Sequence, residues 1–147
     1  MMPEHRAESR RELLFAGTLA LCVILFGPTF GFTAETDKNA FLYVIPREIL
    51  FFSAQAGQWA SIRLDPGERI FQRGADGNVA AVVTSKRAIG FSAAQNALHE
   101  IGLPEEETLE AFKVDGNAAT VLTRRRAIGF SAQMGKWTAI DRFQLGP

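Results

Sequence analysis

The chain has 147 residues, of which 47% are hydrophobic and 22% charged, and 16 basic side chains balance 16 acidic ones. This apolar content excludes a disordered chain, and zero net charge argues against bulk electrostatic capture of nucleic acid, though not against a local basic patch. One cysteine and two histidines exclude an intrachain disulfide and a cysteine-rich metal cluster.

The first 34 residues have the pattern of a targeting segment. A polar start that contains arginines precedes an apolar run from Leu13 to Phe26, and Gly27-Pro28 ends that run because proline breaks a helix. This order predicts an N-terminal hydrophobic helix, either a cleaved signal peptide or an uncleaved signal anchor. Both forms place the rest of the chain outside the cytoplasm: secreted, periplasmic or anchored facing outward. Contact with the membrane is expected only through this segment, if it is uncleaved.

The remaining residues, 35–147, contain one motif written three times. The run RAIGFSA at 87–93 recurs 39 residues later at 126–132, and EILFFSA stands 39 residues earlier at 48–54. Many other positions obey the same spacing without a gap, which is typical of a repeat architecture. The three copies span 37–75, 76–114 and 115–147.

Each copy predicts β-strands. Residues 79–84 and 118–123 are rich in small and β-branched side chains, and a two-residue turn would join each of them to the RAIGFSA motif. A third strand follows in every copy, and a fourth, at 68–73 or 108–114, in the first two. The Asp-Gly turns at Asp76 and Asp115 then close the unit. We therefore expect an all-β protein with eleven strands, built from tandem four-stranded antiparallel meanders of about 39 residues.

The hairpin around Ser85-Lys86 has two apolar faces. One face carries larger side chains and the other smaller ones. The larger face holds Ala80, Val82, Ile89 and Phe91, and the smaller face holds Val79, Ala81, Val83, Ala88 and Gly90. A sheet with one wet face would alternate apolar with charged residues, so we expect both faces to be covered by neighbouring sheets.

Two architectures fit three such units. Stacked, propeller-blade-like sheets explain the two apolar faces, but three blades are too few to close a ring, so the stack would stay open or close by association of two chains. The alternative is a β-trefoil-like closure, which takes three units in a single chain. Apolar sheet ends left uncovered would favour a homo-oligomer.

Catalytic and metal chemistry find little support. His99 is the one histidine after the targeting segment, and its counterparts in the other copies are Ala60 and Thr138. The repeated serines lie at strand ends in all three copies, which structure explains better than nucleophilic catalysis. Neither a phosphate-binding glycine loop nor zinc-ligand spacing is present. We expect no enzyme, no cofactor and no metal site.

Two sets of residues are candidates for binding. The hairpin turns carry six cations, which would lie on one edge if the copies stack in register: Arg47, Lys86, Arg87, Arg124, Arg125 and Arg126. Such an edge would hold an anionic polysaccharide, a lipid head group or an acidic protein. Trp59 and Trp137 occupy one repeat position and would stack on a sugar, although Leu98 at the same position favours a core role.

Two functional hypotheses follow from these patterns. The first is a non-catalytic binding module that contacts an anionic, glycan or protein partner, not nucleic acid, through the basic edge. The alternative is a structural or assembly protein that self-associates through its apolar sheet ends.

Overall fold

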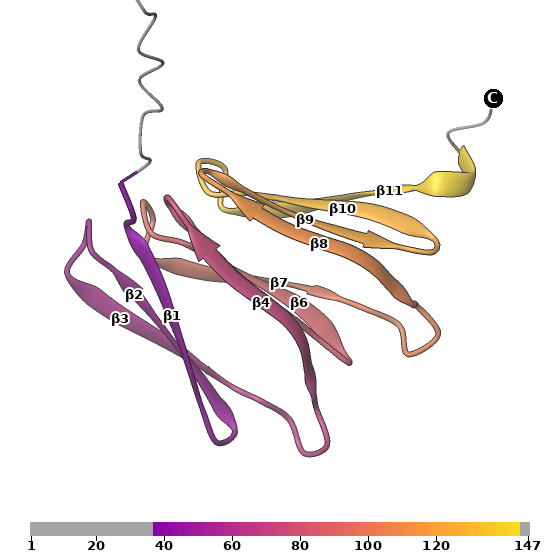
Figure 1. Ribbon diagram of the computed structural model, residues 1–147, viewed down its shortest axis with the longest axis horizontal. Coiled ribbons are helices and arrows are strands. Elements are labelled where there is room, and N and C mark those ends of the chain that lie inside the picture. Colours follow the sequence, from indigo (N-terminus) through magenta and orange to yellow (C-terminus); the bar gives the residue numbers. More distant parts are fainter. Residues whose placement is uncertain (1–36, 145–147) are drawn as a thin grey trace, which may run out of the picture. The chain divides into compact units, whose positions relative to one another are not determined.

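The computed structural model describes residues 37–144, which form an all-β structure without an α-helix (Figure 1). Eleven strands form three antiparallel sheets, and one turn of 3₁₀-helix follows, η1 (Arg142–Gln144). The strands are β1 (Ala40–Ile45), β2 (Glu48–Ser53), β3 (Gln58–Arg63), β4 (Ile70–Asp76), β5 (Val79–Thr84), β6 (Arg87–Ser92), β7 (Ala97–Gly102), β8 (Leu109–Asp115), β9 (Ala118–Thr123), β10 (Arg126–Ser131) and β11 (Lys136–Asp141).

The hydrophobic helix and targeting segment expected within residues 1–34 lie outside the described residues. Between residues 37 and 144, no helix has the length and apolarity needed to span a bilayer.

The strands follow one another in meander order within each sheet. Sheet A holds β1 to β3, sheet B holds β4 to β7, and sheet C holds β8 to β11. The predicted copies place β4 and β8 at the end of a unit, whereas each pairs with the first strand of the next unit. The tight turns explain why each sheet begins one strand before the predicted copy boundary. Gly77 and Gly116 turn the chain at positive φ, 52° and 54°, directly after β4 and β8, so each of these strands pairs with the strand that follows it.

The predicted hairpin registers are confirmed in sheets B and C. Val82 lies opposite Ile89, and Ala80 lies opposite Phe91, so these four side chains share one face. The corresponding pairs in sheet C have the same register. All six residues of β5 are buried. The expectation that both faces are covered therefore holds for the centre of sheet B.

Sheet B lies between the other two sheets (Figure 1). Its larger face packs against Ile49 and Phe51 of sheet A, where the rings of Phe51 and Phe91 stack with centroids 5.3 Å apart. Its smaller face packs against the larger face of sheet C. Two clusters form this second contact: Val79, Ala81, Ala119, Phe130 and Ala132; and Val83, Ala88, Leu103, Val121 and Ile128.

The contact between sheets B and C depends on Gly90. A Cβ atom at this position would lie 2.8 Å from two carbons of the Phe130 ring, closer than side chains pack. The Phe130 ring therefore occupies the space that any other residue at position 90 would fill. A bulky face fits on a small face here because the glycine lets the ring approach the backbone.

Polar ladders run along the stack at the 39-residue spacing. The Asn39 amide donates to Asn78 at 2.8 Å, and the Asn78 amide donates to Asn117 at 2.6 Å. The Ser53 hydroxyl donates to the Ala93 carbonyl, and the Ser92 hydroxyl donates to the Ala132 carbonyl, both at 2.7 Å. These repeated bonds set the lateral position of each sheet on the next, which apolar contacts alone would leave free to slide.

Replacing Gly90 by alanine tests this close approach. Because the added methyl group meets the Phe130 ring, we expect G90A to lose about 1–3 kcal/mol of unfolding free energy in urea titrations. G102A is the matched control, since a Cβ atom there meets nothing within 4 Å. Its stability should stay within about 0.5 kcal/mol of the parent, and an equal loss in both variants would contradict the packing argument.

Candidate functional site

The hairpin turns of the three sheets lie along one edge. Arg87 Nη2 donates to the Arg63 carbonyl of sheet A at 2.8 Å, and Arg126 Nη2 donates to the Gly102 carbonyl of sheet B at 3.0 Å. Each arginine thus ties the start of its own hairpin strand to the end of the neighbouring sheet. The stacking therefore brings the predicted basic residues to one side of the three sheets.

Arg87 is held by two carboxylates. Its guanidinium donates to both oxygens of Glu68, at 3.0 and 2.9 Å, and to Glu100 at 2.6 Å. Thr84 also donates to Glu68, at 2.6 Å, and the Glu68 side chain is fully buried. Burial raises the pKa of Glu68, but hydrogen bonds from Arg87, Thr84 and the Asp65 amide outweigh it and hold the pKa below 4.5.

We call this arrangement, a glutamate with a buried side chain that accepts hydrogen bonds from an arginine and a threonine, a clamp. A second clamp lies one unit later in the chain. Arg126 Nε donates to Glu107 at 2.8 Å, and Thr123 donates to the same carboxylate. The hydrogen bond from Arg126 lowers the pKa of Glu107 against the opposing effect of burial, with Thr123 and the charge of Arg125 adding to it. Both clamps place a buried acid 19 residues before its arginine.

The six predicted cations therefore divide into two groups. Arg87 and Arg126 serve the clamps, and Lys86 lies 3.3 Å from Asp65. Arg47, Arg124 and Arg125 are exposed, and none of them takes part in an ion pair within residues 37–144. Arg47 adopts a positive φ of 65° in its turn. The cationic surface available to a partner is half of the predicted set.

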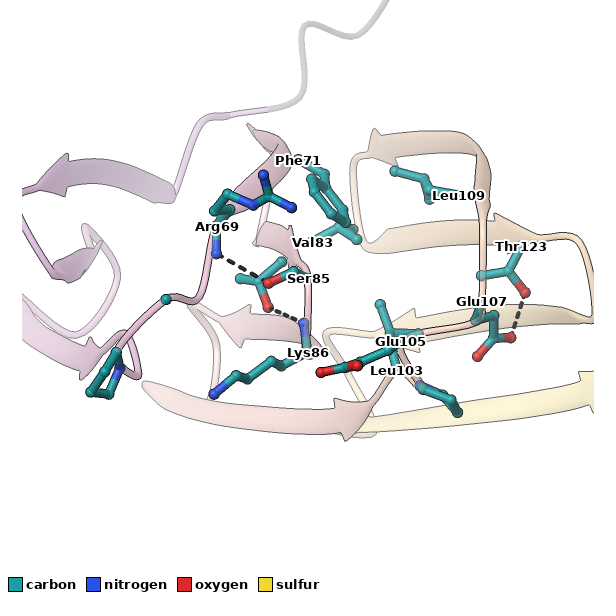
Figure 2. Close-up of a pocket in the computed structure, with 14 residues that line it drawn as sticks. Arg69, Phe71, Val83, Ser85, Lys86, Leu103, Glu105, Glu107, Leu109 and Thr123 are labelled. Carbon is teal, nitrogen blue, oxygen red and sulfur yellow. Dashed lines mark hydrogen bonds between the residues drawn. The ribbon is translucent and has the colours of Figure 1, made fainter.

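A cleft opens at this edge between sheets B and C (Figure 2). Its volume is about 470 Å³, and Phe71 and Leu109 contribute apolar walls. Arg69, Lys86, Glu105 and Glu107 also line it, so the lining carries both signs of charge. In Figure 2 the Arg69 amide is bonded to the Ser85 hydroxyl, at 3.1 Å. This mixed lining does not single out an anionic ligand.

The two predicted tryptophans have different surroundings. Trp137 packs at the contact between sheets B and C and donates its Nε1 proton to the His99 carbonyl at 3.0 Å. Trp59 is 59% exposed on the face of sheet A that points away from sheet B. There it contacts Tyr43 and Phe52, with ring centroids 5.9 and 4.9 Å apart, and Phe52 contacts Phe41 at 6.2 Å.

We define the A face as the outward-pointing apolar side chains of sheet A, which are Phe41, Tyr43, Ile45, Leu50, Phe52 and Trp59. Of these residues, the sequence patterns indicated only Trp59 as a candidate for binding. The signal that could have found the others is the presence of large aromatics at Phe41 and Tyr43, where the next copy has Ala80 and Val82.

The outward side of sheet C is also apolar. We define the C face as Thr120, Leu122, Ala127, Gly129, Thr138 and Ile140, which line a shallow depression. Ile140 is 53% exposed. The counterparts of these residues in sheet B lie beneath sheet C. The two ends of the stack are therefore a face rich in aromatic side chains and a face of smaller side chains.

The histidine considered for catalysis lies on β7. His99 lies beside the Phe130 ring, with centroids 6.1 Å apart, and its Nε2 atom has no hydrogen-bond partner among the described residues. Between residues 37 and 144, no three His, Cys, Asp or Glu side chains converge to hold a metal ion.

Comparison with known proteins gives limited likeness. No family model and no curated protein matches the chain. The chain is similar to a crystal structure of the N-terminal domain of Nup159, with a TM-score of 0.41 and 8% identity. It is also similar to a chain in the S. cerevisiae complex of Dbp5 with Nup159, Gle1, IP6 and ADP, with a TM-score of 0.40 and 8% identity. Each match covers 71% of this chain and 31% of the other.

The clamps predict a specific response to acid. The charged forms of Glu68 and Glu107 stabilise the fold, so their contribution is complete above the unfolded pKa near 4.5 and is lost as pH falls through the lower folded pKa. We expect the unfolding free energy to decline between about pH 5 and pH 3. The double variant E68Q/E107Q should be less stable at pH 7 and should decline less steeply in acid.

The double variant E105Q/E106Q is the control, because these acids are exposed in the same loop as Glu107. It should retain the parent's stability at pH 7 and the parent's decline. Denaturant titrations across this pH range give the comparison. Parallel pH curves for the parent and E68Q/E107Q would contradict the assignment of acid sensitivity to the clamps.

Proposed function

We propose that the protein is a non-catalytic assembly module that acts outside the cytoplasm, and that copies of the chain associate through the A face and the C face. Its sheets are arranged as propeller-blade-like repeats, and the packing of sheets A and C on opposite sides of sheet B supports this over a trefoil-like closure. The extracytoplasmic location rests on the targeting pattern of residues 1–34.

One observation carries the proposal. The positions that are buried on both sides of sheet B are uncovered at the two ends of the stack. Val82 is fully buried beneath sheet A, whereas its counterpart Tyr43 is 53% exposed. Ile101 packs in the contact with sheet C, whereas its counterpart Ile140 is 53% exposed. Contiguous apolar surface of this kind marks an interaction site in a folded protein.

The magnitudes favour contact between whole faces. Burying a large apolar side chain contributes about 1.5–3 kcal/mol, and association costs at least about 4 kcal/mol in lost freedom. Tyr43, Ile45 and Trp59 are each about half exposed, so covering them contributes about half of the full value per side chain. Together these three side chains alone would roughly offset the cost of association. A stable association therefore needs a partner that covers the whole face and is itself apolar, which a second copy supplies.

Substitution of Trp59 tests this function. W59E places a charge on the A face, at the edge strand β3, and since Trp59 is exposed, the fold of the single chain should be retained. We expect the full chain to sediment as an oligomer in density-matched detergent and W59E to sediment as a single chain. The control is F71E, because Phe71 is 49% exposed on sheet B, away from both end faces. Association that is equal in all three proteins would contradict the proposal.

A second candidate function, binding of an anionic partner, is favoured by the turn of sheet C. Arg124 and Arg125 are adjacent and exposed, and both lie outside the clamp that engages Arg126. Two neighbouring guanidinium groups without carboxylate partners among the described residues suit phosphate or sulfate groups. Arg47 extends the same edge on sheet A.

Charge removal at this turn tests the second candidate. We expect R124Q/R125Q to elute from a heparin column at lower salt than the parent, because two cationic contacts are lost. The control is R73Q/K136Q, which removes the same charge from exposed positions on β4 and β11. If both double variants elute together, the turn has no special role in anion binding.

A further inference from the structure

We propose that the A face of one chain docks on the C face of a second chain in the register that sheet C uses on sheet B, so that two chains close a ring of six sheets. This inference rests on the proposed self-association and adds which faces meet, in what register and in what number. The contact between sheets B and C serves as the template for the missing contact.

The A face already has the form of the surface that sheet C presents to sheet B. Phe52 and Trp59 have ring centroids 4.9 Å apart and an interplanar angle of 44°. Phe130 and Trp137, which occupy the same repeat positions in sheet C, have centroids 5.1 Å apart and an angle of 46°. The second pair is covered by sheet B, and Phe130 is only 2% exposed. The first pair therefore has the geometry of a docked pair without its cover.

The C face offers the matching docking position for the Phe52 ring, above Gly129. Phe130 packs on Gly90, and the counterpart of Gly90 on the C face is Gly129. A Cβ atom at Gly129 would meet only Thr138 Oγ1, at 3.9 Å, so the space above this glycine is open within the described chain. Position 129 thus holds a glycine at a place where the single chain has no steric need for one. A Phe52 ring from a second copy would fill that space as Phe130 fills the space above Gly90.

The polar ladders stop at the same two faces. Ser53 and Ser92 each donate to the next sheet, whereas the Ser131 hydroxyl finds no acceptor among residues 37–144. In the proposed register its acceptor is the Ala54 carbonyl of a second copy. Likewise the Asn117 amide, which continues the series of Asn39 and Asn78, would donate to Asn39 of that copy.

The tryptophan bond extends in the same way. Trp137 Nε1 donates to the His99 carbonyl across the contact between sheets B and C. The exposed Trp59 occupies the same repeat position as Trp137, and it would donate to the Thr138 carbonyl on sheet C of a second copy. The aromatic, serine and asparagine contacts all require the same shift along the repeat, so a single docked position satisfies them together.

The number of chains follows from the two unlike ends. A contact between unlike faces is heterologous, and it forms a ring when the rotation closes and a filament when it does not. Propeller rings hold about four to eight sheets, so two chains of three sheets fall inside this range and three chains exceed it. A two-chain ring also forms two contacts for one loss of translational freedom, which favours it over an open pair.

Sedimentation of the full chain in density-matched detergent tests the number of chains in the ring and the docking of Phe52 above Gly129. We expect a native mass twice that of the denatured chain, with no larger species as concentration rises. G129L should weaken the dimer at least about tenfold, since the leucine side chain fills the space that the Phe52 ring of the second chain would occupy. The control G102L should not, because Gly102 lies outside both faces and a Cβ atom there meets nothing.

Disulfide trapping tests the register. In chains that also carry C22S, mixing A54C with S131C should form a cross-linked pair under mild oxidation, and neither variant alone should do so. A single-chain mass at all concentrations would overturn both this inference and the proposed function. An oligomer that forms no mixed cross-link, resists G129L or grows beyond two chains would overturn the ring and leave self-association standing.

Discussion

The arrangement of the three sheets depends on the packing of a bulky face against a small one. Sheet B can carry a sheet on each side only because Gly90 leaves room for the Phe130 ring on one side, while Ile89 and Phe91 fill the other. A larger residue at position 90 would push sheet C away and expose the valines and alanines beneath it. Burial of β5 and β6, and with it the centre of the core, follows from this close approach.

Polar groups at the rims give this packing its register. The serine and asparagine ladders repeat between sheets, and the buried acids Glu68 and Glu107 hold Arg87 and Arg126 at the hairpin ends. These clamps also reduce the number of cations that the basic edge offers to a partner. An arginine that satisfies a buried carboxylate stabilises the fold, since the acid would otherwise lose its hydrogen-bond partners in a dry environment. Among the predicted basic residues within 37–144, Arg47, Arg124 and Arg125 form no ion pair and so remain accessible to a partner.

Much of the secondary structure was predictable because the repeat supplies the same hairpin more than once. The register of Val82 with Ile89 follows from the turn at Ser85-Lys86, and the apolar character of both faces predicted burial on both sides. The partners of the arginines were not predicted, since Glu68 and Glu107 lie 19 residues away in the chain, and Glu68 was expected in a strand although β4 begins only at Ile70. The assignment of β4 and β8 to the preceding unit was also wrong. A repeat has no intrinsic starting point, and only strand pairing defines where a sheet begins.

Local spacing and side-chain size in the sequence set the strands, the tight turns and the division of each hairpin into a larger and a smaller apolar face. The tertiary structure decided which faces meet and which are left over. Phe52 and Phe130 occupy equivalent positions in the repeat, yet Phe130 is buried and Phe52 lies on an open face. Equivalent residues differ in exposure because a stack has two ends, and the position of a sheet in the stack is a property of the assembled chain.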